Sequence, residues 1–404
     1  MALARIASEP RHASYDVVIV GGAMIGSSVA HFLSSHPRFS GRVLVVERDM
    51  TYSKCSTAHT NSCMRQQFSQ EINVRISQFA ADYVKNFRAH MGGDPEVPDV
   101  PLQSFGYLYL AGDERFAQVL RDNQKVQAAL GAGTQILTPG EILRDYPFYN
   151  LDGIALGSLN TKDEGYFDGN TLFDTWRRKA RQAGVEYLAN EVVAMTRAGG
   201  RVASVTLKTG ETIACGLVVN ASGPRAALTA AMAGLAVPVE PRRRYTFIFD
   251  AQKRLARDLP LTIDPSGVHM RTEGDHYMCG CPPDNDTPPD FDDFEMDHSV
   301  WEEKVWPAIA ARVPAFETVK LINSWVGHYE YNTLDQNAII GPHDEVENFL
   351  FVNGFSGHGF QQAPAMGRGA AELIVDGRFT SLDLSPLGYG RIVRGEKFLE
   401  RAVI

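Results

Sequence analysis

Apolar residues near the start of the chain form two short, unbroken runs. Val17–Val20 consists of four β-branched residues, and Val43–Val46 is a second run built from valine and leucine. Runs without polar alternation are typical of strands that are covered on both faces of a parallel sheet. The pattern predicts a strand, a glycine turn and a helix over 16–36, followed by a second strand.

The periodicity changes further along the chain. Where apolar residues recur at helical spacing, the predicted helices cover 71–87, 114–130, 172–183 and 365–375. Between 237 and 325, short strand-like runs alternate with loops rich in Pro and Asp, as in an antiparallel sheet. Leu217–Val219 and Phe349–Val352 again have the pattern of buried strands, and each enters a turn of small residues.

A strand followed by a glycine turn therefore occurs at both ends of the chain, which implies that both ends build one domain. We predict an α/β fold in which a nucleotide-binding domain is interleaved with a cap domain formed around the antiparallel sheet. The nucleotide-binding domain is expected to comprise 14–90, 150–236 and 326–404, and the cap 91–149 and 237–325.

Composition narrows the classes of protein that fit. The 404 residues are 44% hydrophobic and carry a net charge of −9, which argues against a nucleic-acid partner. No apolar run approaches the roughly 20 residues of a membrane span, and residues 1–14, expected to be a flexible arm, lack the apolar centre of a secretory signal. Five cysteines, an odd number, favour a reducing compartment, and we expect the cytoplasm. Cys279 and Cys281 lack a second ligand pair, so no metal site is expected.

The turn after the first strand carries a nucleotide-binding motif. Residues 21–26 read GGAMIG, which matches GxGxxG except that Ala23 replaces the middle glycine. Gly22 keeps the backbone approachable, and the helix N-terminus offers free N–H groups to a pyrophosphate. Glu47 ends the second strand, where its carboxylate can accept hydrogen bonds from both hydroxyls of an adenosine ribose. The sequence therefore predicts a dinucleotide site.

Several motifs together resemble the FAD-dependent amine and amino-acid oxidoreductases of the D-amino-acid-oxidase, glycine-oxidase and sarcosine-oxidase group. They are GGAMIG with Glu47, Ser56–Arg65, Val219–Gly223, Trp325–Gly341 and Gly354–Phe360. The resemblance covers nearly the whole chain. Glu47–Tyr52, Ser56-Thr57 and Arg65–Ser69 are most similar to the branch that contains the FAD-domain assembly factor of mitochondrial complex I and its bacterial relatives.

This resemblance implies a Rossmann-like FAD-binding domain of the GR2-type and a set of cofactor-binding residues. In the family, the first turn holds the pyrophosphate, the residues at 47 and 48 the adenosine ribose, and the GHGF turn lies beside the isoalloxazine. Backbone N–H groups in such a turn can stabilise the negative charge of reduced flavin. The expected FAD-binding residues are Gly21, Ala23, Met24, Ile25, Gly26, Glu47, Arg48, Ser56, Thr57, His59, Ser62, Val192, Ser222, Gly223, Gly357, His358, Gly359, Phe360 and Gln361.

On the substrate side the resemblance is mixed. Arg65 matches a carboxylate-binding arginine of the sarcosine oxidases, whereas Gln361 and Tyr329 replace two basic residues found in other members. Arg243 and Arg244 match a strand arginine that contacts substrate, and one of them should face solvent because adjacent strand residues point to opposite sides. The expected substrate-side residues are Arg65, Arg243, Arg271, Tyr329 and His358.

Two alternatives stay open for these side chains. Arg65 could instead form a salt bridge at the start of a helix. His269 and Arg271 share one face of a strand because they are two residues apart, and that face could line the pocket or lie in solvent.

The resemblance also bears on how the flavin is attached. His328 stands where sarcosine oxidases join FAD through a cysteine, so that thioether is excluded. His59 stands where the dimethylglycine and sarcosine dehydrogenases carry a flavin-linked histidine. We expect non-covalent FAD, with a covalent bond through His59 as the alternative.

The implied activity is FAD-dependent oxidation of the C–N bond of an amino acid or a secondary or N-substituted amine, a small-molecule substrate. Met278 stands where sarcosine oxidases carry a lysine that promotes reaction with oxygen, so a quinone or an electron-transfer protein is the expected acceptor. The alternatives are a D-amino-acid dehydrogenase or oxidase, and a flavin-bearing assembly or binding protein with little turnover. An NAD dehydrogenase would explain the first turn but not the GHGF turn or the cap.

Overall fold

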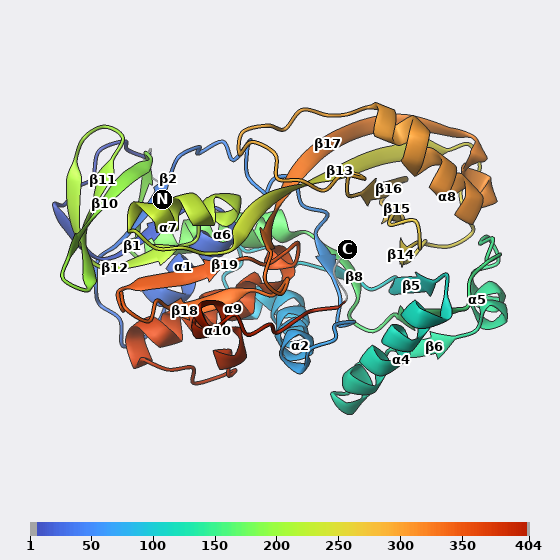
Figure 1. Cartoon of the computed structure of the whole chain (residues 1–404), viewed down its shortest axis with the longest axis horizontal. Coiled ribbons are helices and arrows are strands. Elements are labelled where there is room, and N and C mark those ends of the chain that lie inside the picture. The colour runs from blue at the N-terminus through green and yellow to red at the C-terminus, as the bar shows by residue number, and fades with distance from the viewer. Residues whose placement is uncertain (1–5, 402–404) are drawn as a thin grey trace.

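The computed structural model describes residues 6–401 and contains two large sheets that lie side by side (Figure 1). In the first sheet the strand order is β10-β11-β12-β1-β2-β9, and β19 also pairs with the end of β12 and with β18. Its strands are β1 (Ser14–Val20), β2 (Val43–Glu47), β9 (Glu186–Ala189), β10 (Val192–Ala198), β11 (Arg201–Leu207), β12 (Thr212–Asn220), β18 (Ile339–Pro342) and β19 (Phe349–Asn353). The central pairs β12–β1, β1–β2, β2–β9 and β12–β19 are parallel, as the apolar runs predict.

Both faces of this sheet are covered around β1, β2 and β19, which explains why these strands lack polar alternation. Val17 and Ile19 pack in one core with helices α1 (Met24–Ser34), α2 (Glu71–Lys85), α6 (Gly169–Gln182) and α9 (Gly359–Asp376). Val18 and Val20 pack in a second core with α7 (Ala226–Met232) and α10 (Gly390–Arg394). The helices expected from periodicity over 71–87, 172–183 and 365–375 correspond to α2, α6 and α9.

The second sheet has the strand order β17-β13-β16-β15-β14-β5-β7-β6 and is antiparallel except for the pair β14–β5. Its strands are β5 (Tyr107–Ala111), β6 (Gln135–Leu137), β7 (Leu156–Asn160), β13 (Val239–Ala251), β14 (Leu261–Ile263), β15 (His269–Glu273), β16 (His276–Cys281) and β17 (Val319–Asn332). The remaining elements are β3 (Cys63–Met64), β4 (Leu102–Gln103), β8 (Gly165–Phe167), α3 (Phe87–His90), α4 (Glu114–Ala129), α5 (Pro139–Asp145), η1 (Gly223–Arg225), η2 (Trp301–Val305), α8 (Trp306–Arg312), η3 (Pro314–Glu317) and η4 (Ser385–Leu387). The long strands β13 and β17 reach from the first sheet into the second (Figure 1).

Two expected segment boundaries fall inside the second sheet. β7 pairs with β5 in that sheet, although residues 150–236 were assigned to the nucleotide-binding domain. β17 continues through 325/326 as one strand. Part of the expected N-terminal arm pairs with the sheet, because Ala7 forms a parallel bridge with Leu188 of β9. Residues 1–5 of this arm lie outside the described residues.

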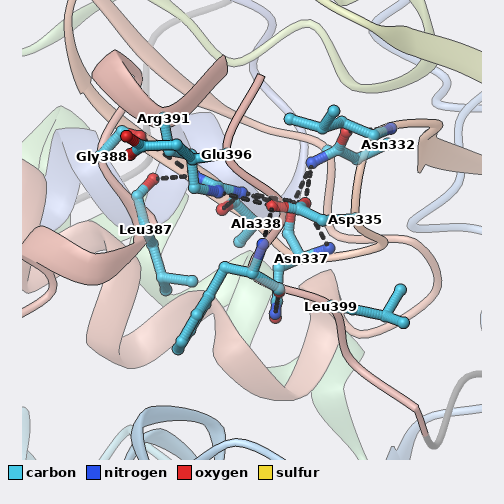
Figure 2. A network of polar contacts seen from close by, with 12 residues as sticks. Asn332, Asp335, Asn337, Ala338, Leu387, Gly388, Arg391, Glu396 and Leu399 are labelled. Atoms are coloured by element: carbon cyan, nitrogen blue, oxygen red, sulfur yellow. Dashed lines mark hydrogen bonds and ion pairs between the residues drawn. The ribbon is translucent and has the colours of Figure 1, made fainter. Parts of the chain in front are cut away.

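A buried polar network joins the C-terminal helix α10 to the turn that precedes β18 of the first sheet (Figure 2). Arg391 of α10 donates from Nε to Asp335 Oδ2 at 2.7 Å and from Nη2 to the Ala338 carbonyl at 2.8 Å. Asp335 also accepts from Asn332 Nδ2 at 2.7 Å. This network links the turn between β17 and β18 to α10.

Candidate active site

Two adjoining cavities lie where the N-terminal end of α1 meets the cap. The first cavity is bordered by the β1–α1 turn, Glu47, Val192 and the turn after β12. The second is bordered by Arg65, the cap strands and the turn at 357–361. The two share their lining at Met24, Ile25, Ser56, Thr57, His328 and Glu330. The two cavities therefore adjoin along this shared wall, and together we call them the channel.

The β1–α1 turn packs closely because it lacks side chains. A Cβ on Gly26 would lie 1.9 Å from the Gly21 carbonyl oxygen. Gly21 has φ +98°, and a Cβ there would lie 2.4 Å from the Ala221 carbonyl oxygen at the end of β12. The turn thus brings the start of α1 to the first cavity, where the Met24 N–H donates to Thr57 Oγ1 at 3.2 Å. This backbone cradle fits a pyrophosphate at a helix N-terminus.

Glu47 is held at the first cavity by two backbone donors. Gly22 N–H and Asp49 N–H donate to its two carboxylate oxygens, each at 2.8 Å. Burial raises the pKa of this carboxyl, while the two N–H groups oppose the shift. The fixed carboxylate at the end of β2 fits the ribose of a dinucleotide.

A loop of the cap reaches over the first cavity. Asp292 accepts from Arg48 at 2.5 Å and from Arg225 at 2.7 Å, so it bridges two sides of the cavity. Phe294 stacks on His328 with ring centroids 4.2 Å apart. Arg48 is therefore engaged with the cap as well as bordering the expected adenosine site.

Arg65 is buried in the second cavity and its position is set by several partners. Its Nη1 donates to the Gln67 carbonyl at 2.7 Å, and its Nη2 lies 2.5 Å from His358 Nε2. Its guanidinium stands 4.1 Å from the centroid of the Phe68 ring. Burial and the charge of Arg65 hold the pKa of His358 well below its usual range, so His358 is neutral and its Nε2 accepts from Arg65.

The loop that carries Arg65 rests on a buried carboxyl. Glu164 accepts from Gln66 N–H at 2.6 Å, from Gln67 Nε2 at 3.0 Å and from Asn160 Nδ2 at 2.8 Å. Burial raises the pKa of Glu164 to about 7. The Arg65 backbone N–H donates to Gln361 Oε1 at 2.8 Å, which ties the loop to α9.

The cap supplies the other wall of the second cavity. The Arg244 guanidinium lies 4.6 Å from the centroid of the Tyr329 ring, and its Nη1 donates to Asp286 at 3.0 Å. His269 Nε2 lies 3.1 Å from Asn61 Nδ2. Burial, with the charges of Arg271 and Arg244, lowers the pKa of His269 to about 4, so this histidine is neutral.

The structure brings most of the expected residues to the channel. The first cavity is lined by Gly21, Ala23, Met24, Ile25, Glu47, Arg48, Ser56, Thr57, Val192, Ser222 and Gly223. The second is lined by Met24, Ile25, Ser56, Thr57, His59, Ser62, Arg65, Tyr329, Gly357, His358, Gly359, Phe360 and Gln361. Gly26 does not line either cavity but allows the close packing of the β1–α1 turn that does.

Two residues expected on the substrate side, Arg243 and Arg271, lie elsewhere, and so does Met278. Arg243 is paired with Asp293, while Arg244, its neighbour on β13, lines the second cavity. Arg271 pairs with Glu273 and donates from Nη2 to the Asn61 carbonyl at 3.0 Å, outside the set of described cavity-lining residues. Met278 is buried in β16 and also lies outside that set, which removes its geometric support for a choice of electron acceptor.

The sequence reasoning missed several lining residues. Glu330, Tyr107, Phe291 and Phe294 were not proposed, although all border the channel. The one available signal was a glutamate that stands between two tyrosines, Tyr329 and Tyr331. Among residues 6–401 there is no cluster of His, Cys, Asp or Glu suited to a metal ion, and no helix long and apolar enough to cross a membrane.

The first sheet carries the glycine turn and the fixed carboxylate of Glu47, and the channel continues from them to the antiparallel cap. This combination is typical of dinucleotide-binding flavin oxidoreductases. The chain belongs to the FAD dependent oxidoreductase (DAO) family, whose model matches residues 16–373. Its cofactor is FAD. The predicted family, fold class and cofactor are thereby confirmed.

Individual relatives agree with this assignment. The chain is 38% identical over 423 residues to the FAD-dependent oxidoreductase domain-containing protein 1 of Xenopus laevis, covering 96% of this chain and 85% of that protein. It is 24% identical over 390 residues to the mitochondrial sarcosine dehydrogenase of Mus musculus, covering 92% of this chain and 41% of that protein. The structure of L-proline dehydrogenase from P. horikoshii matches with a TM-score of 0.83 at 27% identity, covering 95% of this chain and 99% of that one.

We expect the FAD to be released by acid precipitation. His59 lines the second cavity, but its Nδ1 lies 2.9 Å from the Cys55 carbonyl and its ring packs against Phe294 with centroids 5.2 Å apart. These contacts suit a histidine that packs beside the cofactor. Yellow colour in the supernatant after precipitation checks the expectation. Colour that stays in the pellet, and disappears from it in His59→Ala, would establish the covalent bond instead.

Proposed function

We propose that this protein oxidises the C–N bond of a secondary or N-substituted amino acid. The observation that carries the proposal is Arg65, a buried cation on the wall of the second cavity, near the turn at 357–361. A carboxylate that enters this cavity would meet a guanidinium already oriented by His358 and the Gln67 carbonyl. Sarcosine and proline, named for two of the relatives, are both N-substituted amino acids.

The chain's own residues would bind, orient and desolvate the substrate. Arg65 would fix the carboxylate, and Tyr107 and Tyr329 would enclose the carbon skeleton. Neutral His358 and neutral His269 add no further positive charge to the walls, so an amine can be held as its free base. Bound FAD supplies the acceptor for the hydride that leaves the carbon next to nitrogen. Catalysis by these residues is then mainly positioning and exclusion of water.

The acceptor and the compartment belong to the same proposal. We propose a quinone or an electron-transfer protein in preference to oxygen, supported only by the sequence correspondence of Met278 to the lysine of the sarcosine oxidases, and a reducing, cytoplasmic location. The reducing location is supported by the five free thiols, Cys55, Cys63, Cys215, Cys279 and Cys281. The choice of electron acceptor is tested by mixing the reduced protein with air-saturated buffer or with a soluble quinone and comparing the rates at which the flavin is reoxidised.

Anaerobic mixing with candidate substrates tests the proposal. Sarcosine and L-proline are expected to bleach the flavin, whereas the corresponding amines without a carboxylate and the D-isomer of alanine are expected to be far slower. Bleaching by D-alanine alone would make the protein a D-amino-acid dehydrogenase or oxidase. If no amine bleaches a flavin that dithionite reduces readily, the protein is a flavin-bearing binding or assembly protein, and the proposal is wrong.

A further inference from the structure

Glu330 occupies the place where the two cavities join. It lies on β17 and borders both the first and the second cavity, together with Ser56, Thr57 and His328. The residue is 8% exposed. The Gly354 N–H donates to Glu330 Oε2 at 3.0 Å, and the Ser356 N–H donates to the Glu330 backbone carbonyl at 3.0 Å. Both donors belong to the loop that leads into the 357–361 turn.

No positive charge is paired with this carboxyl in the described part of the chain. On its own strand, Tyr329 and His328 are titratable neighbours that border the channel. Burial raises the pKa of the Tyr329 phenol and lowers the pKa of the His328 imidazole to about 4, so both are neutral. Arg225, on η1 packed against β17, is paired with Asp292. Arg244, on the adjacent strand β13, is engaged by Asp286 and the Tyr329 ring. His358, at the start of α9, is neutral as well, and the α1 end and the 56–57 loop contribute uncharged Met24, Ile25, Ser56 and Thr57.

We propose that Glu330 is a cofactor-binding residue that acts as a neutral carboxylic acid, donating its proton in a hydrogen bond to FAD where the cofactor passes between the cavities. A buried carboxyl with one N–H partner and no cation is more stable protonated than ionised, because ionisation would leave an uncompensated charge. Protonation also gives it a donor that a carboxylate lacks. FAD is rich in acceptor oxygens, whereas two of the other polar side chains at the junction are already engaged with backbone carbonyls. Ser56 Oγ donates to the His328 carbonyl at 2.5 Å, and His328 Nε2 lies 2.8 Å from the Asp293 carbonyl.

The proposal makes FAD binding depend on pH. Burial raises the pKa of Glu330 to about 8, so the proton is present at neutral pH and is lost as the pH rises through that value. If FAD binds only the protonated form, its affinity is constant below the pKa and falls about tenfold for each pH unit above it. Ionised Glu330 would place a negative charge beside an anionic cofactor, which reinforces the loss.

The experiment follows FAD release from diluted holoprotein by flavin fluorescence, from about pH 6 to about pH 10. The wild-type protein is expected to release more FAD above about pH 8. Glu330→Gln keeps a neutral donor of similar shape and should bind FAD equally well at all these pH values. Glu330→Ala, which lacks the donor, should release FAD even at low pH. The absorption spectrum of bound flavin should shift with the same midpoint in the wild type and not in Glu330→Gln, a readout that also serves if the flavin proves covalent.

Glu164→Gln is the matched control, because Glu164 is another buried carboxyl with a raised pKa that does not border either cavity. It should keep the wild-type pH dependence. Circular dichroism at each pH separates cofactor release from unfolding. A wild-type protein whose FAD release and spectrum do not change with pH would overturn the proposal. So would a Glu330→Gln protein with wild-type pH dependence, or a folded Glu330→Ala protein that retains FAD as tightly as the wild type.

Discussion

Replacement of Arg65 by alanine is expected to lower kcat/KM for a carboxylate-bearing substrate by a factor between about 30 and about 5,000, which corresponds to about 2–5 kcal/mol of transition-state binding. The reason is that a charge-assisted pair is removed while the substrate carboxylate stays buried. Arg65 is 2% exposed, so water cannot replace the lost guanidinium without entering the cavity. Steady-state kinetics on the substrate found by flavin bleaching provide the measurement.

The controls separate carboxylate binding from a structural role. Arg65→Lys keeps the charge but loses the two-pronged geometry, so it should recover part of the activity. An amine substrate without a carboxylate should react equally well, or equally poorly, with Arg65→Ala and with the wild type. Arg243→Ala removes a neighbouring arginine of β13 that does not line the second cavity, and it should leave kcat/KM unchanged. If folded Arg65→Ala keeps full activity, Arg244 becomes the better candidate for the carboxylate.

Local patterns predicted the part of the fold that depends on neighbours in sequence. Val17–Val20 and Val43–Val46 are buried on both faces, and their uninterrupted apolar composition predicts that burial. The glycine turn and Glu47 have a fixed spacing along one βαβ unit, so a single sequence was enough to place them together. The first cavity was therefore largely foreseeable.

The second cavity depends on long-range pairing that a single sequence does not reveal. Alternation on a strand showed that only one of Arg243 and Arg244 could face the pocket, but the choice required the register of β13 against β17. His269 and Arg271 share a buried face, so the solvent alternative is wrong, yet only His269 reaches the cavity. Arg271 turns to Glu273 and the Asn61 carbonyl instead. Glu330 was not predicted because its position between the two cavities depends on contacts between segments that are far apart in the sequence.

The buried pair between Arg391 and Asp335 should be worth about 3–5 kcal/mol of folding free energy when only one partner is removed. Arg391 is 5% exposed and Asp335 1% exposed, so either partner left alone is a charge in a poorly solvated site. In Arg391→Ala the remaining carboxylate keeps the Asn332 Nδ2 and Phe398 N–H donors, which places the expected loss toward the lower end of that range. Denaturant unfolding, monitored by circular dichroism on holoprotein, measures it.

A double-mutant cycle makes this prediction specific. Asp335→Asn with Arg391→Ala removes both charges together, and its loss should be clearly smaller than the sum of the losses in Asp335→Asn and in Arg391→Ala. The exposed pair Arg394 and Glu396 is the control, because Arg394→Ala should change the free energy of unfolding little. The ion pair also holds the turn before β18. Because β18 pairs with β19, and β19 leads into Gly354 and the 357–361 turn, a change at the pair can reach the channel. Arg391→Ala should therefore also bind FAD more weakly than the wild type at temperatures below its unfolding midpoint. Additive single losses, or a folded Arg391→Ala protein with wild-type stability, would show that the pair does not stabilise the fold. A destabilised Arg391→Ala protein that retains FAD as tightly as the wild type would show that the network does not couple the C-terminal segment to the channel.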